Sequence, residues 1–436
     1  MMSEGLIYTK EQYVEKNIAY FREQSKARAY LLGVEMEHFL INRDTLRSYR
    51  YDEPGGQKEI MESLRDSGWN IIVIEDGNIL GLEKEGSTVT LEPGGQIEFS
   101  LKPLKTVGEI DEAYRTIASE IKAILRPEQA LVSLGYHPRT KISELSLLPK
   151  KRYAMMFDYF REHGRFCHNM MKGTASTQVS IDYLNEEDFI KKFRVANFIS
   201  PVMANLFDST PIFEGEKYSG RNCRTAIWEE TDIKRSKLIP GSLDSRFDFE
   251  AYARFLLKIP PILLLSNGVV HYTKNQPLEE LLGAYPLTVS DLEHIQTMVF
   301  PDVRLKKYLE IRMADALPYP YNLSVVALIK ALFYDTGNLD ELYELSLNYD
   351  DAWVRRQNIQ LTKRVEALDP DFIKITDRIM EMALESLDSN ERWPLEMLKT
   401  LREKENSMSF YLSRLYDQDQ AEFVKNIEVL EDNHEN

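Results

Sequence analysis

The sequence predicts an α+β fold in which an antiparallel sheet precedes a helical C-terminal portion. Between residues 70 and 101, short apolar runs are separated by turn-forming residues, which is the pattern of successive hairpins. Further strand patterns lie singly among helical segments, and from about Tyr321 onward every apolar pattern has the period of a helix. Strands and helices that are segregated along the chain in this way are typical of the α+β class.

The N-terminal part begins with a helix and continues with strands. Lys10 to Ala29 has the period of an amphipathic helix, and Tyr30 to Asn42 alternates as a strand does. Three shorter strands follow, and glycine-containing turns separate them, so we expect antiparallel pairing. The strands are Ile71–Ile74, Ile79–Leu82 and Val89–Leu91, and the turns are Asp76-Gly77-Asn78 and Glu85-Gly86-Ser87.

The later part contains two isolated strands, Thr177–Tyr183 and Lys307–Met313, and then helices alone. From Gln420 the sequence is mostly acidic and weakly apolar, which is typical of a frayed helix. No repeat or linker divides the chain. We therefore expect residues 1–320 to form the main domain and residues 321–436 to pack on it as a helical portion.

Composition argues against nucleic-acid and membrane partners. The chain carries 70 acidic and 54 basic residues, a net charge of −16 that repels phosphate backbones and anionic membranes. The most apolar stretch, Phe255 to Val270, is interrupted by lysine and prolines and is too short to span a bilayer, so we expect it to be buried. The expected assembly is a monomer or a homodimer.

The cysteine content and the N-terminal residues bear on location. The chain has two cysteines, Cys167 and Cys223, and neither has the spacing of a zinc site. Met1 to Lys10 lack the basic segment and the apolar run of a signal peptide. These observations predict a reducing, cytoplasmic location.

Several strands place acidic or amide side chains on one face. Because side chains alternate along a strand, Glu35 and Glu37 share the face opposite Val34 and Met36. The same alternation pairs Gln96 with Glu98, just after Glu92 and a Pro-Gly-Gly bend. It recurs in two further strands, which present Gln178, Ser180 and Asp182 in one case and Glu310 and Arg312 in the other.

A sheet with one solvated side gives a similar alternation. These positions, however, are nearly all carboxylates or carboxamides, and like charges that face each other across strands destabilise a sheet. A bound divalent cation would remove this conflict. Oxygen ligands without histidine or cysteine favour Mg²⁺ or Mn²⁺ over zinc, and Mg²⁺ commonly bridges carboxylates to substrate phosphates. Nucleotide chemistry is therefore the leading hypothesis.

Common catalytic motifs are absent from the sequence. The nearest match to a phosphate-binding GxxxxGK[ST] loop, Gly215 to Gly220, continues with Arg221-Asn222 and lacks the lysine. There is no GxGxxG, HExxH or GxSxG, and the seven histidines are isolated from one another. A Ser/His/Asp hydrolase could still assemble from distant segments, but nothing in the sequence indicates one.

One segment resembles a known family closely. Residues 89–100, Val-Thr-Leu-Glu-Pro-Gly-Gly-Gln-Ile-Glu-Phe-Ser, are similar to the LEPGGQxE(L/F)S signature of the plant and proteobacterial glutamate–cysteine ligases, which related actinobacterial enzymes of ergothioneine synthesis share. The resemblance extends over about residues 30 to 320. Other matching segments, in order, are Gly33–Glu37, Arg152-Tyr153 with Tyr159-Phe160, Met170-Met171 with Thr174–Val179, Lys192–Arg194, Arg224–Trp228 with Thr231-Asp232, and Tyr308–Arg312.

The resemblance implies a glutamine-synthetase-like fold, with an antiparallel sheet curled into a funnel and flanking helices, and makes residues 1–320 an ATP-dependent ligase domain. It implies that ATP phosphorylates the γ-carboxylate of glutamate and that the amine of cysteine then displaces phosphate. ATP is the co-substrate, and Mg²⁺ or Mn²⁺ is the expected metal. The implied metal ligands are Glu35, Glu37, Glu92, Glu98, Gln178 and Glu310; the catalytic residues are Arg312, Glu98 and Glu310; and the substrate-binding residues are Arg224, Trp228, Arg152 and Thr174.

Alternatives stay open at this point. Arg224 could form a structural ion pair, and Trp228 could serve core packing. Lys172-Gly173 replaces an apolar-then-Arg pair of plant-type members, and residues 100–103 depart from a Ser-Gly-x-Pro ending, so the identity of the acceptor amine stays open. The alternatives are a ligase that uses another amine and a catalytically silent regulatory homologue, although a silent homologue would have no need for these mutually repelling carboxylates.

Overall fold

The long strand β1 (Leu32–Asn42) lies at the centre of the fold in the computed structural model, which describes residues 5–25, 30–273, 275–363 and 368–430. It belongs to an open, nine-stranded sheet of order β14-β15-β7-β1-β5-β4-β3-β2, and β6 pairs with the far half of β1. All of these pairs are antiparallel. The other strands are β2 (Asn70–Glu75), β3 (Asn78–Lys84), β4 (Ser87–Leu91), β5 (Ile97–Leu104), β6 (Gln129–Val132), β7 (Thr177–Ile181), β14 (Val303–Leu305) and β15 (Leu309–Ile311).

The hairpins from β2 to β4 confirm the turn chemistry that the sequence predicts. Asp76 and Gly77 connect β2 to β3, and Glu85 and Gly86 connect β3 to β4. All four residues have positive φ, between 48° and 85°. Two consecutive residues with positive φ form the type I′ turn, whose twist matches the strands that it joins.

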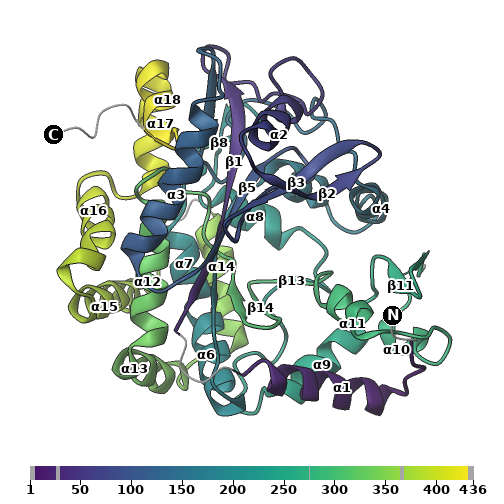
Figure 1. Cartoon of the computed structure of the whole chain (residues 1–436). Helices are drawn as coiled ribbons and strands as arrows, with labels where there is room; N and C mark the ends of the chain where they lie inside the picture. Colours follow the sequence, from purple (N-terminus) through teal and green to yellow (C-terminus); the bar gives the residue numbers. More distant parts are fainter. Residues whose placement is uncertain (1–4, 26–29, 274, 364–367, 431–436) are drawn as a thin grey trace.

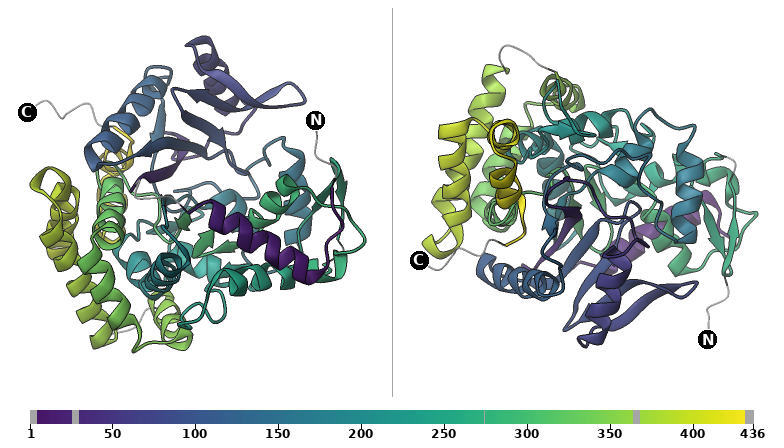
Figure 2. Two further views of the ribbon diagram at one scale, coloured as in Figure 1. Left: turned by 60° about the horizontal axis from the view of Figure 1, so that its bottom comes forward. Right: turned by 90° about the horizontal axis from the view of Figure 1, so that it is seen from above.

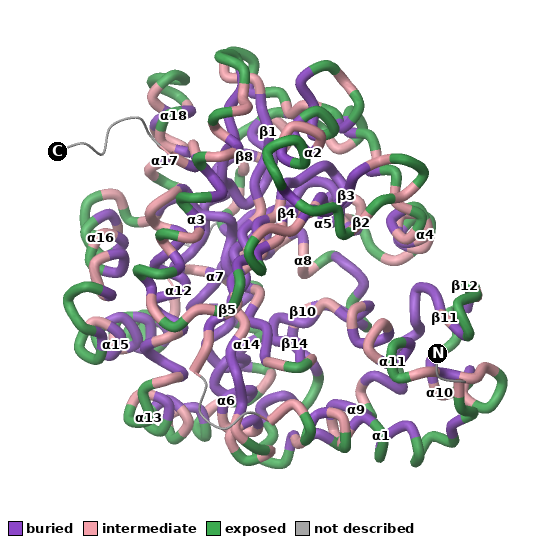
Figure 3. The backbone as a smooth tube through the Cα atoms, viewed as in Figure 1, coloured by how far each residue is buried: buried purple, intermediate pink, exposed green. Residues whose placement is uncertain are grey.

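The apolar face of the sheet packs on two helices, α3 (Val107–Lys122) and α12 (Asn322–Tyr334). Leu32, Val34 and Met36 of β1 are almost fully buried, while the intervening Glu35 and Glu37 are only partly buried. Each fully buried apolar side chain of this size contributes about 1.5–3 kcal/mol relative to exposure. Burial therefore fixes which face of β1 turns away from the core. Figure 3 shows buried residues along β1.

The C-terminal helices form a layer outside α12, as the sequence predicts. Helices α15 and α16 pack against α12, and α18 contacts β6. Figures 1 and 2 show this layer on the side of the molecule opposite α1 (Lys10–Glu23) and the β11–β12 hairpin. The helices of this layer are α13 (Thr336–Ser346), α15 (Pro370–Ser386), α16 (Ser389–Glu405), α17 (Met408–Gln418) and α18 (Gln420–Ile427). Helix α14 (Asp351–Thr362) lies apart from this layer and packs on α6, α7 and α8.

The other face of the sheet is polar and is covered by connecting segments. Those that matter for the site are helices α4 (Lys151–Phe160), α5 (Cys167–Gly173) and α8 (Cys223–Glu229). The remaining helices are α2 (Gln57–Asp66), α6 (Glu186–Phe198), α7 (Ser200–Leu206), α9 (Phe249–Lys258), α10 (Leu278–Leu281) and α11 (Val289–Gln296). The small strand pairs are β8–β9 (Ile212–Phe213 and Glu216–Lys217), β10–β13 (Ser236–Lys237 and Phe300–Pro301) and β11–β12 (Leu264–Ser266 and Val269–His271).

Three local predictions need correction. Helix α1 ends at Glu23, and residues 26–29 of the predicted Lys10–Ala29 helix lie outside the described residues. The predicted strand Lys307–Met313 is the three-residue β15, which pairs with β14 in a hairpin that the sequence pattern did not reveal. The stretch Phe255 to Val270 is not wholly buried, because Val269 and Val270 lie exposed on β12. Within the described ranges, no helix combines the length and apolarity needed to cross a membrane.

Candidate active site

A cavity of about 310 Å³ lies against the polar face of the sheet, within the size range of ligand-binding pockets. Strands β1, β5 and β7 form one wall, and residues from α4, α5, α8 and the β13–β15 segment form the others. It brings together every site residue predicted from the sequence except Glu310. Its lining comprises Glu35, Glu37, Glu92, Pro93, Gln96, Glu98, Lys150, Arg152, Tyr153, Met156, Met170, Met171, Thr174, Ser176, Gln178, Arg224, Trp228, Thr297, Phe300, Arg304, Lys306 and Arg312.

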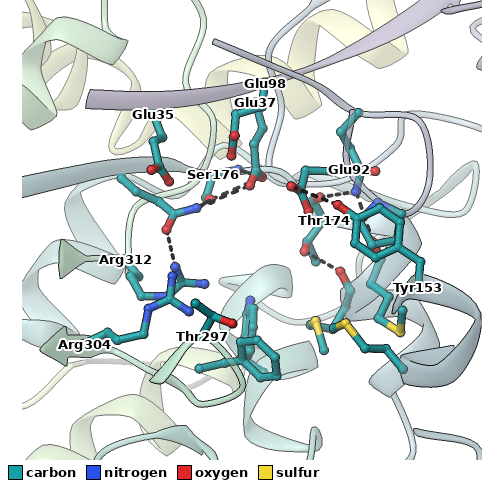
Figure 4. A pocket seen from close by; sticks show the side chains of 18 of the residues that line it. Glu35, Glu37, Glu92, Glu98, Tyr153, Thr174, Ser176, Thr297, Arg304 and Arg312 are labelled. Atoms are coloured by element: carbon teal, nitrogen blue, oxygen red, sulfur yellow. Dashed lines mark hydrogen bonds between the residues drawn. The ribbon is translucent and has the colours of Figure 1, made fainter. Parts of the chain in front are cut away.

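The sheet register sets the carboxylates side by side. Glu37 of β1 is the direct cross-strand partner of Glu98 on β5, and Glu35 lies between Ser100 and Gln178. Figure 4 shows Glu35, Glu37 and Glu98 on one side of the cavity, with Arg304 and Arg312 on the opposite side. A wall of acids that faces cations suits a polyanionic ligand together with a divalent cation.

The carboxylates of this wall, Glu35, Glu37, Glu92 and Glu98, form no ion pair with a described residue, and the cations nearby only partly offset their charge. Burial, and secondarily the neighbouring carboxylates, raises the pKa of Glu35 and of Glu37 to about 8, and the pKa of Glu98 to about 7. Burial also raises the pKa of Glu92. Desolvation and like charge both disfavour the ionised form of an acid. A bound cation would therefore stabilise the ionised form of these carboxylates.

Hydrogen bonds hold three of these carboxylates in place. Glu37 Oε2 accepts from the backbone nitrogen of Ser176 at 2.7 Å, and Glu98 Oε1 accepts from Thr90 Oγ1 at 2.8 Å. Tyr153 donates to Glu92 Oε1 at 3.4 Å. The described residues contain no group of three or more histidine, cysteine or acidic side chains already close enough to hold a metal ion. A cation would therefore need ligands from a substrate as well.

Glu310 does not line the cavity, because three cations enclose it. Its carboxylate is 2.6 Å from Arg304 Nε, 3.0 Å from Lys306 Nζ and 2.9 Å from Arg312 Nη1. Burial alone would raise the pKa of Glu310, but these cations hold it well below its usual range. Arg304 and Lys306 are cavity residues that the sequence reasoning missed. Arg304 and Lys306 alternate with Val303 and Leu305 in the sequence, and this alternation could have revealed that they share one strand face.

Glu310→Gln is expected to destabilise the protein by about 3–5 kcal/mol, because it leaves the buried Arg304 and the partly buried Lys306 and Arg312 without their carboxylate. Urea unfolding of the metal-free protein measures this change. Glu98→Gln is the matched comparison, since it removes a carboxylate that has no cation within its hydrogen bonds. Equal stability of the Glu310→Gln variant and the wild type would contradict the proposed role of this carboxylate in holding the cations.

Gln178 is engaged at both ends of its amide. Its Nε2 donates to Glu37 Oε1 at 3.3 Å and to Ser176 Oγ at 3.1 Å, and its Oε1 accepts from Arg312. It therefore connects the acidic wall to the cationic one. A metal ion could reach its oxygen only if Arg312 moved.

Arg224 and Trp228, one helical turn apart on α8, lie together at one end of the cavity. The Arg224 guanidinium is 5.8 Å from the Trp228 ring, and it donates to the carbonyl oxygens of Met313 and Arg312, both at 3.2 Å. Arg224 Nε and Trp228 Nε1 are buried without a hydrogen-bond partner among the described residues. Buried donors are rarely left unpaired, so these two are candidates for ligand contact.

The other two predicted substrate residues are placed differently. Arg152 Nη2 donates to the backbone oxygen of Thr297 at 3.2 Å and to its hydroxyl at 3.0 Å, while Nε has no partner within the described part of the chain. The hydroxyl of Thr174 donates to the backbone oxygen of Met170 at 2.8 Å. Arg152 thus keeps a donor for a ligand, whereas Thr174 shapes the end of α5.

One known protein family matches most of the chain. The sequence model of glutamate-cysteine ligase family 2 matches residues 31–368. The chain belongs to this family. The resemblance found in the LEPGGQ segment is therefore confirmed, and the chain is a ligase enzyme of the glutamate-cysteine ligase family.

Curated relatives and a solved structure agree with this family. Glutamate–cysteine ligase A of Oryza sativa subsp. japonica is 30% identical over 373 residues, which cover 83% of this chain and 74% of that one. The Arabidopsis thaliana enzyme is 29% identical, with coverages of 80% and 68%. The crystal structure of the Francisella tularensis glutamate–cysteine ligase in complex with AMP matches 90% of this chain and 86% of that one with a TM-score of 0.55 at 11% identity, which supports the predicted fold class.

The cytoplasmic location predicted from the sequence is overturned, because both plant relatives are chloroplastic enzymes. The physical reason is that a low cysteine content indicates a reducing compartment at most. It does not distinguish one reducing compartment from another.

Both cysteines of this ligase are free and buried. Burial raises the pKa of Cys167 to about 11 and the pKa of Cys223 well above its usual value, so neither thiol is reactive near neutral pH. We expect Cys167→Ser and Cys223→Ser to leave turnover nearly unchanged and insensitive to reductant. Assays with and without dithiothreitol test this. A strong response to reductant that disappears in either variant would be the contrary result.

Proposed function

We propose that this protein is an ATP-dependent glutamate–cysteine ligase, which forms γ-glutamylcysteine, ADP and phosphate. One observation carries the proposal within this family. A single cavity joins four partly buried carboxylates, which form no ion pair with a described residue, to Arg312 and to the unpaired donors of Arg224, Arg152 and Trp228. The first group suits a metal–phosphate complex, and the second suits the carboxylate of an amino acid.

The acidic wall fits Mg²⁺ by its donor set. Glu35, Glu37, Glu92 and Glu98 provide hard oxygen ligands, and their raised pKa values indicate missing positive charge. Mg²⁺ usually takes one or two carboxylates and completes its shell with water and substrate phosphate, so a preassembled cage is unnecessary. When bound, Mg²⁺ would neutralise charge on the transferred phosphoryl group. Glu310 and Gln178 are secondary candidates, because the cations that they hold would have to move.

Arg312 is assigned to the reacting phosphoryl group. Its guanidinium lies between Glu310 and Gln178, both of which accept its hydrogen bonds, so its position is fixed before a ligand arrives. Preorganised donors aimed at developing charge are usually the largest single contribution to catalysis. Here Arg312 would stabilise charge while the γ-carboxylate of glutamate becomes an acyl phosphate. The acceptor amine then attacks that carbonyl carbon, and phosphate leaves.

The cavity residues all lie between Glu35 and Arg312, so we propose that residues 1–320 carry the chemistry. Residues 321–436 would then have a supporting role, because α12 packs on β1 and β7 of the sheet and α14 packs on α8. A coupled ADP-release assay with glutamate, Mg²⁺ and a panel of acceptor amino acids tests the whole proposal. Cysteine should give the highest kcat/KM. Faster turnover with another amine would indicate a different acceptor, and no turnover with any acceptor would indicate a silent homologue.

The raised pKa values predict how pH affects the metal-free protein. Glu35 and Glu37 have an ordinary pKa of 4.5, as in the unfolded chain, and a pKa of about 8 in the folded protein. The folded state therefore binds more protons, and its unfolding free energy falls as pH rises from 4.5 towards about 8. Added Mg²⁺ should restore stability most at the upper end of this range. Urea unfolding at about pH 6 and about pH 8.5, with EDTA or Mg²⁺, measures both effects. An unfolding free energy that rises with pH in EDTA would contradict this prediction.

A further inference from the structure

A second, smaller recess adjoins the main cavity at Arg224 and Trp228. It has a volume of about 10 Å³ and shares Phe300 and Arg312 with the main cavity as well. Lys237 and Asp302 line the recess but not the main cavity. This volume is about that of one water molecule, and an ammonium group is of similar size.

Asp302 places an unpaired acceptor in this recess. Its side chain is 6% exposed, and its Oδ2 has no hydrogen-bond partner among the residues that the structure describes. The other oxygen, Oδ1, is 3.2 Å from Lys237 Nζ. An unpaired buried carboxylate oxygen is costly, so its presence beside a cavity indicates a ligand that donates a hydrogen bond.

The backbone holds Asp302 firmly between β13 and β14. Its nitrogen donates to the carbonyl oxygen of Lys237 at 3.1 Å, and its carbonyl oxygen accepts from the nitrogen of Arg312 at 3.1 Å. The carboxylate is therefore positioned by the same segment that positions Arg312. Such support is what a recognition site needs if it is to bind its ligand without rearrangement.

The unpaired donors and the unpaired acceptor fit two different groups of one ligand. Arg224 Nε and Trp228 Nε1 are donors, which suit a carboxylate, and Asp302 Oδ2 is an acceptor, which suits an ammonium. All three residues line the recess, and Arg224 and Trp228 also line the main cavity. A carboxylate and an ammonium that are attached to the same carbon atom define a free α-amino acid.

We propose that Asp302 is a specificity-determining residue that binds the α-ammonium group of glutamate in this recess, while Arg224 and Trp228 bind the α-carboxylate. This inference rests on the proposed function for its choice of glutamate. It explains how the site would select an α-amino acid over a simple dicarboxylic acid of the same length. Glutarate, which lacks only the α-ammonium group, is the matching probe.

The test compares the binding of glutamate and glutarate by titration calorimetry in the presence of Mg²⁺ and a non-hydrolysable ATP analogue. Wild type should bind glutamate about 10- to 100-fold more tightly than glutarate, the range expected for one charge-assisted hydrogen bond. Asp302→Asn should lose most of this preference, because glutamate binds more weakly and glutarate binds about as before. Unchanged preference in Asp302→Asn, or equal weakening of both ligands, would overturn the assignment.

Glu229→Gln is the matched control. Glu229 Oε1 is 3.6 Å from Lys237 Nζ, so it belongs to the same ion-pair group as Asp302, but it does not line the recess. The control should keep the preference for glutamate. If Asp302→Asn folds poorly because Lys237 loses a partner, the double variant Asp302→Asn/Lys237→Met removes the pair together and should show the same loss of preference.

Binding and turnover separate the two proposals. A wild type that prefers glutamate through Asp302 but releases no ADP would refute the ligase proposal and leave this recognition site standing. A wild type that turns over glutamate, with full preference retained in Asp302→Asn, would refute the recognition site alone.

Discussion

Glu98→Gln is expected to lower kcat by about 10²-fold or more, and turnover of the wild type is expected to cease in excess EDTA. Glu98 lies directly across from Glu37, and burial with neighbouring acids raises its pKa to about 7. Gln has the same shape but provides a neutral, weaker ligand. It therefore removes the charge that a metal ion needs while keeping the hydrogen bonds from Thr90 and Ser100 possible.

The same substitution should not harm the metal-free fold, because Glu98 is an acid that burial disfavours in its ionised form. Steady-state ADP release across a Mg²⁺ series, together with urea unfolding in EDTA, separates the two effects. Glu83→Gln is the control, since Glu83 lies on β3 of the same sheet but outside the cavity. Wild-type kcat in Glu98→Gln, or full turnover in EDTA, would remove the metal from the mechanism.

The sequence predicted the acidic wall because a strand has only two faces. Once Val34 and Met36 are recognised as core residues, Glu35 and Glu37 must point the other way. The glycine turns of the β2–β4 meander are equally local, and they too were predicted. Features that depend on a few neighbouring residues were therefore accessible from the sequence.

The cationic wall was only partly accessible from the sequence. Arg312 was predicted, because it alternates with Ile311 in a recognisable strand. Arg304 and Lys306 were missed, because β14 has three residues, too few for its alternation to stand out. The alternation also placed Glu310 on an open face, whereas the hairpin turns Arg304 and Lys306 over it.

Pairings between distant segments were equally hidden from the sequence. Arg152 is bound to Thr297, 145 residues later, and Asp302 meets Lys237 through the β10–β13 pair. The spacing of side chains along one strand carries no information about such contacts.

Arg224→Ala is expected to raise the KM for glutamate about 30- to 1,000-fold and to leave the KM for ATP nearly unchanged. The proposed contact is charge-assisted and worth on the order of 2–4 kcal/mol, at about 1.4 kcal/mol per decade. Arg224 is buried, and its Nη atoms already donate to the carbonyl oxygens of Arg312 and Met313, so the guanidinium is fixed before substrate binds. The Nε donor has no partner among the described residues and is available for the α-carboxylate.

One further variant and a stability measurement distinguish the role of Arg224 in substrate recognition from its role in supporting the chain. Arg224→Lys should restore only part of the affinity, since an ammonium provides charge but cannot both hold the carbonyl oxygens of Arg312 and Met313 and reach the ligand with a planar fork. Urea unfolding of each variant measures how much the lost backbone bonds destabilise the fold, and a stable Arg224→Ala protein with a high KM for glutamate isolates the substrate contact. If Arg224→Ala instead raises the KM for ATP and spares that for glutamate, this end of the cavity binds the nucleotide. The proposal that Asp302 binds the α-ammonium group would then also fail, because it requires Arg224 to bind the α-carboxylate of the same ligand.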